Sequence, residues 1–365
     1  MQLRTRPDVA VVGGGVIGLT IAWRAARAGL GRIAVLDPEI EADAPDQASW
    51  AAAGMLAPVT EVHFGEEPLL ALTMASAARW PVHAAELADA TGTQPAGFGY
   101  RESGTLSIAR DADDMAALDD LAAYQDKLGL RVQRLRGREC RALEPALAPA
   151  TRGGLLVEGD HQVDNRALVL ALREACRRAG VALLAERVQQ LADVDAGVVV
   201  LAAGAASGEL APELPVRAVK GQLLHLRGPE PLAGRNLRGV EVYLVPRADG
   251  RLAVGATVEE RGDTTVTARG VHDLLRAAIE LLPDVGELEL VGATAGRRPG
   301  TPDNAPLLGW HDQRTLVATG HYRNGVLLSP VTADLAVQLL TGGGGGAVPE
   351  QARAFDPGRF ARGAP

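Results

Sequence analysis

The chain has 365 residues, of which 47% are hydrophobic and 22% charged. At about 150 residues per domain this length favours two domains, and the composition excludes a wholly disordered or collagen-like chain. A chain of this size can bury a large core without disulfides or a structural metal. Its 45 acidic residues outnumber the 37 basic ones, giving a formal charge of −8, and the sequence has no long basic run. Because phosphate binding depends on clustered cations, the sequence predicts no nucleic-acid partner.

A strand, helix, strand unit is predicted at the start of the chain. Residues 8–12 have the continuous apolar pattern of a buried strand, and residues 16–28 predict a helix that stops at Gly29. Residues 32–36 predict the second strand. The apolar run after Arg4 and Arg6 could suggest a signal peptide, but it contains regularly spaced glycines and is too short to span a bilayer. The segment is therefore expected to belong to the mature fold, and no membrane association is predicted.

Gly13, Gly15 and Gly18 form a G-x-G-x-x-G pattern between the first strand and the helix. In dinucleotide-binding turns the first glycine permits the tight turn and the second lets the backbone approach a pyrophosphate. The third lets the helix pack closely on the strand, and the helix N-terminus stabilises the anion. Asp37 follows at the end of the second strand, where a carboxylate can accept the ribose hydroxyls. The motif predicts a dinucleotide site but does not distinguish FAD from NAD.

The remaining elements are assigned from hydrophobic periodicity and turn residues. The acidic segment 39–47 predicts a loop, and the small-residue stretch ASWAAAGMLAP follows it. Apolar and polar residues alternate between 217 and 258, which predicts an antiparallel hairpin system. The glycine- and proline-rich segment 295–306 predicts another loop. Helices are predicted at 67–90, 112–127, 165–178, 272–282 and from 323 onward, strands at 104–109, 182–185, 198–202, 219–227, 240–247, 251–258, 288–292 and 316–320, and a turn at 153–154.

Cys140 and Cys176 are far apart in the sequence and from any His/Cys cluster with metal-ligand spacing. Two reduced thiols are therefore predicted, with neither a disulfide nor a metal site. Histidines such as His225 and His321 are interpreted as core or loop residues, and no general base is assigned.

Several stretches, taken in their order along the chain, carry a family resemblance: GGGVIG, ASWAAAGML, GDHQVDNRAL, VVVLAAGAAS, VKGQ, VYLVPRADGRLAVGAT, GRRPGT and TGHYRNGVLLSPVT. Together they resemble the glycine oxidases of the D-amino-acid-oxidase-like FAD-dependent oxidoreductases, a family associated with making the thiamine thiazole. The resemblance implies an α/β fold with a discontinuous, Rossmann-like FAD-binding domain of the GR2 type and a substrate domain of antiparallel sheet plus helices. The domains are expected at residues 1–85, 155–217 and 293–365 for FAD and at 86–154 and 218–292 for the substrate.

The same resemblance implies which residues contact a non-covalent FAD. The cofactor-binding residues by this resemblance are Gly13, Gly15, Val16, Ile17, Gly18, Asp37, Pro38, Ala48, Ser49, Ala53, Gly54, Met55, Val188, Gly204, His321, Tyr322, Arg323, Asn324, Gly325, Val326 and Leu327. A helix N-terminus near His321 to Leu327 suits the negative charge of reduced flavin. Short side chains at 51–54 suit a flat ring. Since the sequence has no cysteine after Cys176, no cysteinyl link is expected.

Three residues are expected to hold the substrate. By the resemblance Arg298 binds its carboxylate, Tyr243 hydrogen-bonds the same group, and Arg323 is a second substrate contact. A guanidinium suits this task because its planar fork matches a carboxylate. The residues alone leave other readings open: Arg298 as a surface loop residue, Tyr243 as strand core and Arg323 as a structural ion-pair residue.

The expected reaction is oxidation of glycine and other small amines such as sarcosine and D-alanine. The products would be an imine, then a 2-oxo acid and ammonia, with O2 reduced to H2O2. One alternative is an FAD-dependent dehydrogenase of D-amino or 2-hydroxy acids with another electron acceptor, and another is a non-catalytic flavin-binding protein. The two reduced thiols predict a cytoplasmic protein, and the resemblance implies a homo-oligomer, a homotetramer, whose partners are the amino acid and O2.

Overall fold

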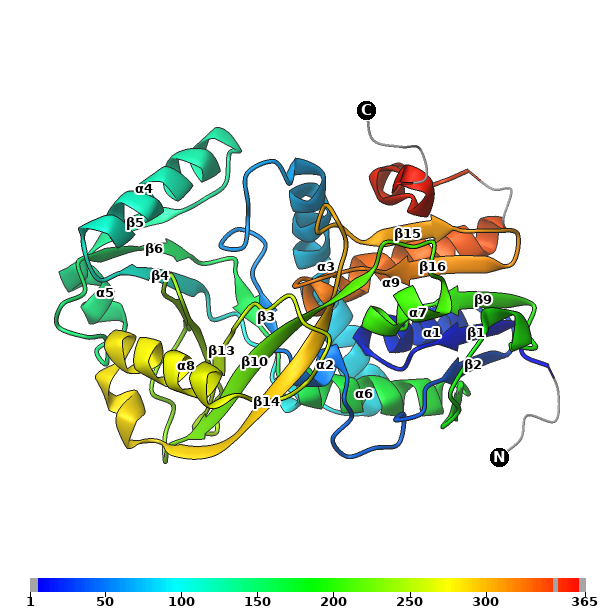
Figure 1. Cartoon of the computed structure of the whole chain (residues 1–365), viewed down its shortest axis with the longest axis horizontal. Coiled ribbons are helices and arrows are strands. Elements are labelled where there is room, and N and C mark those ends of the chain that lie inside the picture. Colours follow the sequence, from blue (N-terminus) through cyan, green and yellow to red (C-terminus); the bar gives the residue numbers. More distant parts are fainter. Residues whose placement is uncertain (1–5, 344–346, 361–365) are drawn as a thin grey trace.

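The computed structural model describes residues 6–343 and 347–360 (Figure 1). One of its two large sheets has six strands in the order β15-β16-β9-β1-β2-β8. Its neighbours pair in parallel, except that β15 and β16 are antiparallel. The central strands are short apolar runs, as parallel strands covered on both faces require. The strands are β1 (Val9–Val12), β2 (Ile33–Leu36), β8 (Ala182–Leu184), β9 (Val198–Leu201), β15 (Leu307–Trp310) and β16 (Thr315–Thr319).

Helices α1 (Val16–Arg27), α6 (Asn165–Arg178) and α9 (Gly325–Gly342) pack beside this sheet, and α3 (Glu67–Thr91) packs on α6 and α9. Among the described helices, α9 is the one with the length and hydropathy of a membrane span, and 61% of that window is buried within the fold. Its apolar composition is therefore explained by packing against α1 and α3. The large core here also contains Trp23 and Trp80.

The second large sheet has eight strands in the order β14-β10-β13-β12-β11-β4-β6-β5. Its pairs are antiparallel, except that β11 and β4 are parallel. The strands β3 (Met55–Leu56) and β7 (His161–Gln162) form a separate two-stranded sheet. The elements of this half are β4 (Thr105–Ala109), β5 (Gln133–Arg136), β6 (Gly153–Val157), β10 (Arg217–Arg227), β11 (Asn236–Arg238), β12 (Tyr243–Pro246), β13 (Arg251–Gly255), β14 (Glu289–Gly300), α4 (Ala112–Lys127), α5 (Gly137–Leu143) and α8 (Ala268–Leu281).

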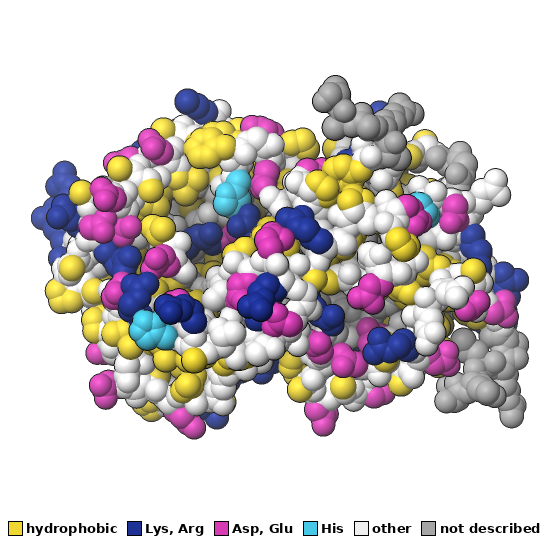
Figure 2. Space-filling view, viewed as in Figure 1, with side chains coloured by type: hydrophobic (Ala, Val, Ile, Leu, Met, Phe, Trp, Pro, Cys, Tyr) yellow, Lys and Arg dark blue, Asp and Glu magenta, His cyan; other side chains and the backbone are white. Residues whose placement is uncertain are grey.

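Strands β10 and β14 form the longest ladder in the molecule, pairing from Arg217 with Gly300 to Arg227 with Glu289. In Figure 1 they run as two long arrows from the eight-stranded sheet toward the six-stranded one. The ends nearest the six-stranded sheet carry the residues that line the cavity described below. On the face shown in Figure 2, Lys and Arg side chains are interspersed with Asp and Glu over both parts of the molecule.

The α/β fold class, with a parallel sheet and a largely antiparallel one, is as the sequence predicted. Six strands were not predicted, namely β3, β5, β6, β7, β11 and β15, and residues 153–154 form part of β6 rather than a turn. Helix α8 begins at Ala268, because the Thr267 side chain accepts the amide of Gly270 and caps it.

The prediction of a loop at 295–306 is wrong for its first half. Strand β14 continues to Gly300, because every residue from 296 to 300 pairs with β10. Arg298 therefore lies on a strand and not in a loop. The predicted domain limits at 154/155 and 292/293 fall inside β6 and β14, whose strands continue on both sides of each limit. The domain division stays a prediction.

Candidate active site

A cavity of about 380 Å³ extends from the glycine-rich turn after β1 to the ends of β10, β12 and β14. It brings together segments that are far apart in the sequence. Of the 23 residues predicted to bind cofactor or substrate, Gly18 and Leu327 do not line it and the others do. The cavity is also lined by residues that were not singled out from the sequence, including Glu61, Arg187, Gly221, Gly296, Arg297 and Pro299.

The turn between β1 and α1 has the close packing that its glycines predict. Gly13 has φ +112°, and a Cβ there would lie 2.3 Å from the carbonyl oxygen of Ala202. A Cβ on Gly18 would lie 1.9 Å from the carbonyl oxygen of Gly13. Gly18 thus acts through helix packing, which explains why it does not line the cavity. Leu327 is buried instead, and its carbonyl oxygen accepts hydrogen bonds from Ser76 and Trp80.

Polar groups around this turn form a cradle for a nucleotide. The Asp37 carboxylate, at the end of β2, accepts the amides of Gly14 (2.7 Å) and Glu39 (2.8 Å) and the side-chain amide of Gln47 (3.0 Å). The amide of Val16 in the first turn of α1 donates to Ser49 Oγ (2.9 Å). Backbone amides at a helix N-terminus beside a fixed carboxylate suit a pyrophosphate next to a ribose.

The middle of the cavity is lined by short side chains from 51 to 54. Gly54 has φ +75°, and a Cβ there would lie 1.9 Å from the carbonyl oxygen of Val163. A Cβ on Gly296 of β14 would lie 2.6 Å from the Cβ of Ala51. These close approaches leave a wall without bulky side chains, which can accept a flat ring. The donors and the shape of the cavity therefore fit FAD.

The start of α9, with Asn324 at its N-cap, forms another part of the lining. Tyr322 has a positive φ of 45°, and its amide donates to the carbonyl of Pro299. His321 is fully enclosed, and its Nε2 lies 3.0 Å from Thr332 Oγ. Burial lowers the pKa of His321 to about 3, so this histidine is neutral at physiological pH. The helix dipole and free amides here suit an anion.

Arg298 and Tyr243 form the end of the cavity nearest the eight-stranded sheet. Arg298 Nη1 donates to the carbonyl oxygens of Thr257 (3.1 Å) and Lys220 (3.3 Å). A Cβ on Gly221 would lie 2.2 Å from both terminal guanidinium nitrogens, so the guanidinium crosses β10 where that strand has no side chain. Burial raises the pKa of Tyr243, while nearby Arg298 and Arg238 act in the opposite direction. The phenol is therefore protonated and can donate to a carboxylate.

Glu61 links two further guanidinium groups at this end. It forms an ion pair with Arg238, and its Oε2 lies 3.9 Å from Nε of Arg323. Burial, together with the charge of Arg323, lowers the pKa of Arg238 to about 10. Glu61 and Arg238 were missed, because nothing in their local sequence distinguishes them from the many other charged residues of the chain.

Other titratable groups lie outside this cavity. Cys140 and Cys176 are both buried, and burial raises the pKa of the Cys140 thiol to about 11 and that of Cys176 to about 12. Within residues 6–343 and 347–360, no group of three or more His, Cys, Asp and Glu side chains is arranged to hold a metal ion.

Comparison with known proteins places the chain among flavoproteins. The model of the family described as "DAO: FAD dependent oxidoreductase" matches residues 8–339. The chain is 35% identical to the glycine oxidase of Geobacillus kaustophilus, covering 92% of this chain and 93% of that protein. The crystal structure of glycine oxidase from Geobacillus kaustophilus aligns with a TM-score of 0.88 at 34% identity, covering 97% of this chain and 99% of that one.

A second kind of relative is longer. The chain is 37% identical to the bifunctional protein ThiO/ThiG of Synechocystis sp., covering 98% of this chain and 55% of that protein. It therefore spans about half the length of this bifunctional relative. The crystal structure of iminodiacetate oxidase from Chelativorans sp. shares the fold, with a TM-score of 0.83 at 24% identity.

Proposed function

Because the chain belongs to the FAD-dependent oxidoreductase family and is of the glycine oxidase type, we propose that it oxidises glycine and other small amines with O2. The proposed substrates include sarcosine and D-alanine. The amino acid loses a hydride from Cα and a proton from nitrogen, giving an imine, which water converts to the 2-oxo acid and ammonia, or methylamine when the substrate is sarcosine. O2 takes up the two electrons and two protons and becomes H2O2.

When bound, FAD supplies the acceptor for the hydride and passes the electrons to O2. The groups that would hold it are those of the cradle: the turn at Gly13 to Ile17, Asp37, Ser49 and the small residues before Met55. The wall formed by the start of α9 would face the part of the ring that becomes negative on reduction. We propose that this FAD is non-covalent, since the two cysteines lie outside the cavity.

The observation that carries the proposal is the meeting of Arg298, Tyr243 and Arg323 in the cavity that the glycine-rich turn also lines. A guanidinium and a protonated phenol at one end can bind a carboxylate by charge-assisted hydrogen bonds. The small-residue wall is then beside the Cα of the bound amino acid. The three side chains would thus orient the substrate by its carboxylate.

Among the cavity-lining residues in the described part of the chain, none is assigned as a general base. His321 is neutral and bonded to Thr332, and Glu61 is paired with Arg238. The substrate amine therefore loses its proton to water before the hydride leaves. A hydride transfer of this kind needs positioning more than it needs acid and base catalysis.

The test is peroxide formation by the FAD-saturated enzyme with glycine, sarcosine and D-alanine. Arg298→Lys should raise KM by about tenfold or more, because a lysine cannot form the two parallel bonds. Arg276→Lys, on the exposed surface of α8, is the matched control. Absence of peroxide with all three amines would contradict the proposal. Turnover with dyes but not with O2 would instead identify a dehydrogenase, and flavin binding without bleaching a non-catalytic protein.

We further propose that the product is used in thiamine biosynthesis. This rests on relatives named bifunctional protein ThiO/ThiG and, in Rhizobium etli, putative thiamine biosynthesis oxidoreductase ThiO, the latter 34% identical. A strain that lacks this gene should then need thiamine for growth, and growth without it would argue against the role. The cytoplasmic location and the homo-oligomeric state stay predictions.

A further inference from the structure

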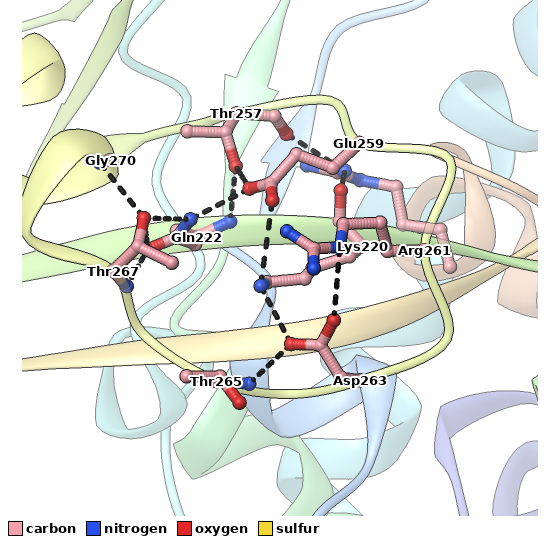
Figure 3. A network of polar contacts seen from close by, with 10 residues as sticks. Lys220, Gln222, Thr257, Glu259, Arg261, Asp263, Thr265, Thr267 and Gly270 are labelled. Atoms are coloured by element: carbon pink, nitrogen blue, oxygen red, sulfur yellow. Dashed lines mark hydrogen bonds and ion pairs between the residues drawn. The ribbon is translucent and has the colours of Figure 1, made fainter.

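Lys220 is one of the two lysines of the chain, and its side chain is 0% exposed. Its ammonium lies 2.8 Å from Asp263 Oδ1 and 3.4 Å from Glu259 Oε2 (Figure 3). A buried ammonium is retained only when it is paired, because burial of a single charge is strongly unfavourable. The Lys220 ammonium takes no direct part in the proposed reaction. Its burial with two carboxylates therefore indicates a different role.

The side chain of Lys220 lies on the face of β10 opposite to the cavity. Successive side chains of a strand point to opposite faces. Gly221 and Leu223 line the cavity, whereas Lys220 and Gln222 do not. Lys220 therefore cannot touch the substrate, and any effect it has on the site must pass through the backbone.

The network on this face attaches the segment 256–267 to β10. Lys220 and Glu259 exchange two backbone hydrogen bonds, of 2.9 and 3.0 Å. The amide of Gln222 donates to Thr257 Oγ (2.9 Å), and its side chain bonds Glu259 (2.7 Å) and accepts the amide of Thr267 (2.8 Å). Figure 3 shows these side chains converging from β10 and from the segment that passes over it.

The same attachment presents two carbonyl groups to Arg298. The Thr257 carbonyl, from the attached segment, and the Lys220 carbonyl, from β10, both accept hydrogen bonds from Arg298 Nη1. One of these acceptors exists at this place only because the segment is held against β10. If the segment moved, the guanidinium would lose its 3.1 Å contact and one constraint on its orientation.

We propose that Lys220, together with Glu259 and Asp263, is a positioning group for Arg298. Its ion pairs fix the segment 256–267 on β10, and the fixed carbonyls orient the guanidinium toward the substrate carboxylate. This inference rests on the proposed function, in which Arg298 binds that carboxylate. It assigns a role in substrate affinity to a side chain on the reverse face of the sheet.

Lys220→Met is the most direct test, because methionine has a similar length and shape and lacks the charge. Glu259 and Asp263 are 23% and 40% exposed, so water can solvate both carboxylates once the ammonium is gone. KM for glycine should rise about tenfold while kcat changes by less than about twofold, since the loss affects binding of the carboxylate. The dissociation constant of acetate, followed by the flavin absorbance, should rise by the same factor.

Glu260→Gln is the matched control. Glu260 is next to Glu259 on the same segment, and it pairs with Arg217 of the same strand at 3.1 Å. That pair is largely exposed, with side chains 47% and 64% accessible, and exposed pairs contribute little. KM for glycine and acetate affinity should stay at the wild-type values in this variant.

If Lys220→Met does not fold, Asp263→Asn and Glu259→Gln test the same ion pairs. Each should raise KM for glycine, by less than is expected for Lys220→Met. A folded, FAD-binding Lys220→Met variant with wild-type KM and acetate affinity would overturn the inference. So would a crystal structure of it in which Arg298 still contacts the Thr257 carbonyl. A wild-type enzyme without turnover or acetate binding would instead contradict the proposed function, and the Arg298 position in the variant would still decide the inference.

Discussion

Asp160 is a fully buried carboxyl group that fixes the chain just before Glu61. It accepts hydrogen bonds from the amides of Val59 (3.2 Å) and Thr60 (2.7 Å) and from the Thr60 hydroxyl (2.6 Å). Burial raises its pKa to about 6, although the hydrogen bonds from Thr60 and Val59 act in the opposite direction. The carboxyl group thus connects the turn after β6 to the two residues that precede Glu61, which lines the cavity.

This pKa predicts a contribution to stability with an unusual sign. The folded protein binds the Asp160 proton more tightly than the unfolded chain, whose carboxyl has a pKa near 3.8. The free energy of unfolding should therefore fall as the pH rises from about 4 to about 6, by about 1.4 kcal/mol per unit of pKa difference. Urea unfolding of wild type and Asp160→Asn across this range checks it, because the asparagine variant lacks the titration.

Asp164, four residues on, is a control of opposite sign. Burial tends to raise its pKa, but Arg247 and Arg251 outweigh this and lower the pKa below 3.8. Asp164 should therefore add to the free energy of unfolding above about pH 4, and this contribution should be lost as the pH falls below that value. The test compares the free energy of unfolding of wild type with that of Asp160→Asn. If their difference stays constant or increases between pH 4 and 6, the assignment for Asp160 is contradicted.

At the scale of single residues, site residues that lie within a sequence motif could be predicted. Residues that are brought together only by tertiary contacts could not. The cavity contains Arg298, Tyr243 and Arg323, all of which were found through motifs that surround them. Glu61 and Arg238 meet across 177 positions of sequence. No local pattern marks such a pair, because its partners are set by the packing of β11 against the segment after β3.

At the scale of elements, the crossing of Arg298 over β10 depends on one residue without a side chain. Gly221→Ala would place a Cβ 2.2 Å from the guanidinium nitrogens. The guanidinium must then move away from the Thr257 and Lys220 carbonyls, and KM for glycine should rise about tenfold, with a smaller effect on stability. Steady-state kinetics and thermal unfolding of the same preparation measure both effects.

Gly292→Ala on β14 is the matched control, since a Cβ at Gly292 would have no heavy atom within 4 Å. The kinetic constants of this variant should match those of wild type. An unchanged KM in a folded Gly221→Ala variant would mean that Arg298 does not lie across β10 in the working enzyme.

The elements that the sequence missed either depend on a partner strand or are too short to show a pattern. The first part of 295–306 contains Gly296, Pro299 and two arginines, which are typical of a loop. Pairing with β10 nevertheless makes it a strand, because strand formation depends on a partner more than on local preference. The three-residue strand β11 gave too little periodicity to be found, whereas the regular helices α1, α4 and α6 were predicted close to their observed limits.

At the scale of the whole molecule, the cavity is assembled from both large sheets, so the bound cofactor should stabilise the entire fold. Its lining includes Val12 of β1, Tyr243 of β12 and Val326 of α9. A ligand that binds the folded chain alone raises the free energy of unfolding with its concentration. The flavin-free protein should therefore unfold at a lower temperature, and added FAD should restore the higher one.

The non-covalent attachment is checked on the same protein. Acid precipitation should release all yellow colour into the supernatant. Colour that stays with the protein pellet would show a covalent link, and a melting temperature that does not respond to FAD would mean that the cavity is not the cofactor site.

Arg297 and Arg298 are adjacent on β14, but their side chains contact different partners. Arg298 faces Val219 across the ladder and reaches the Thr257 carbonyl, whereas Arg297 faces Lys220 and pairs with Asp46 at 3.3 Å. A slip of the ladder by one position would exchange them, because side chains alternate between the faces. The irregularity of the ladder lies between His225 and Leu226, away from this end, and pairing is uninterrupted from Arg217 to His225. The register of the ladder thus gives these two adjacent arginines different contacts. Neither can replace the other when one of them is substituted.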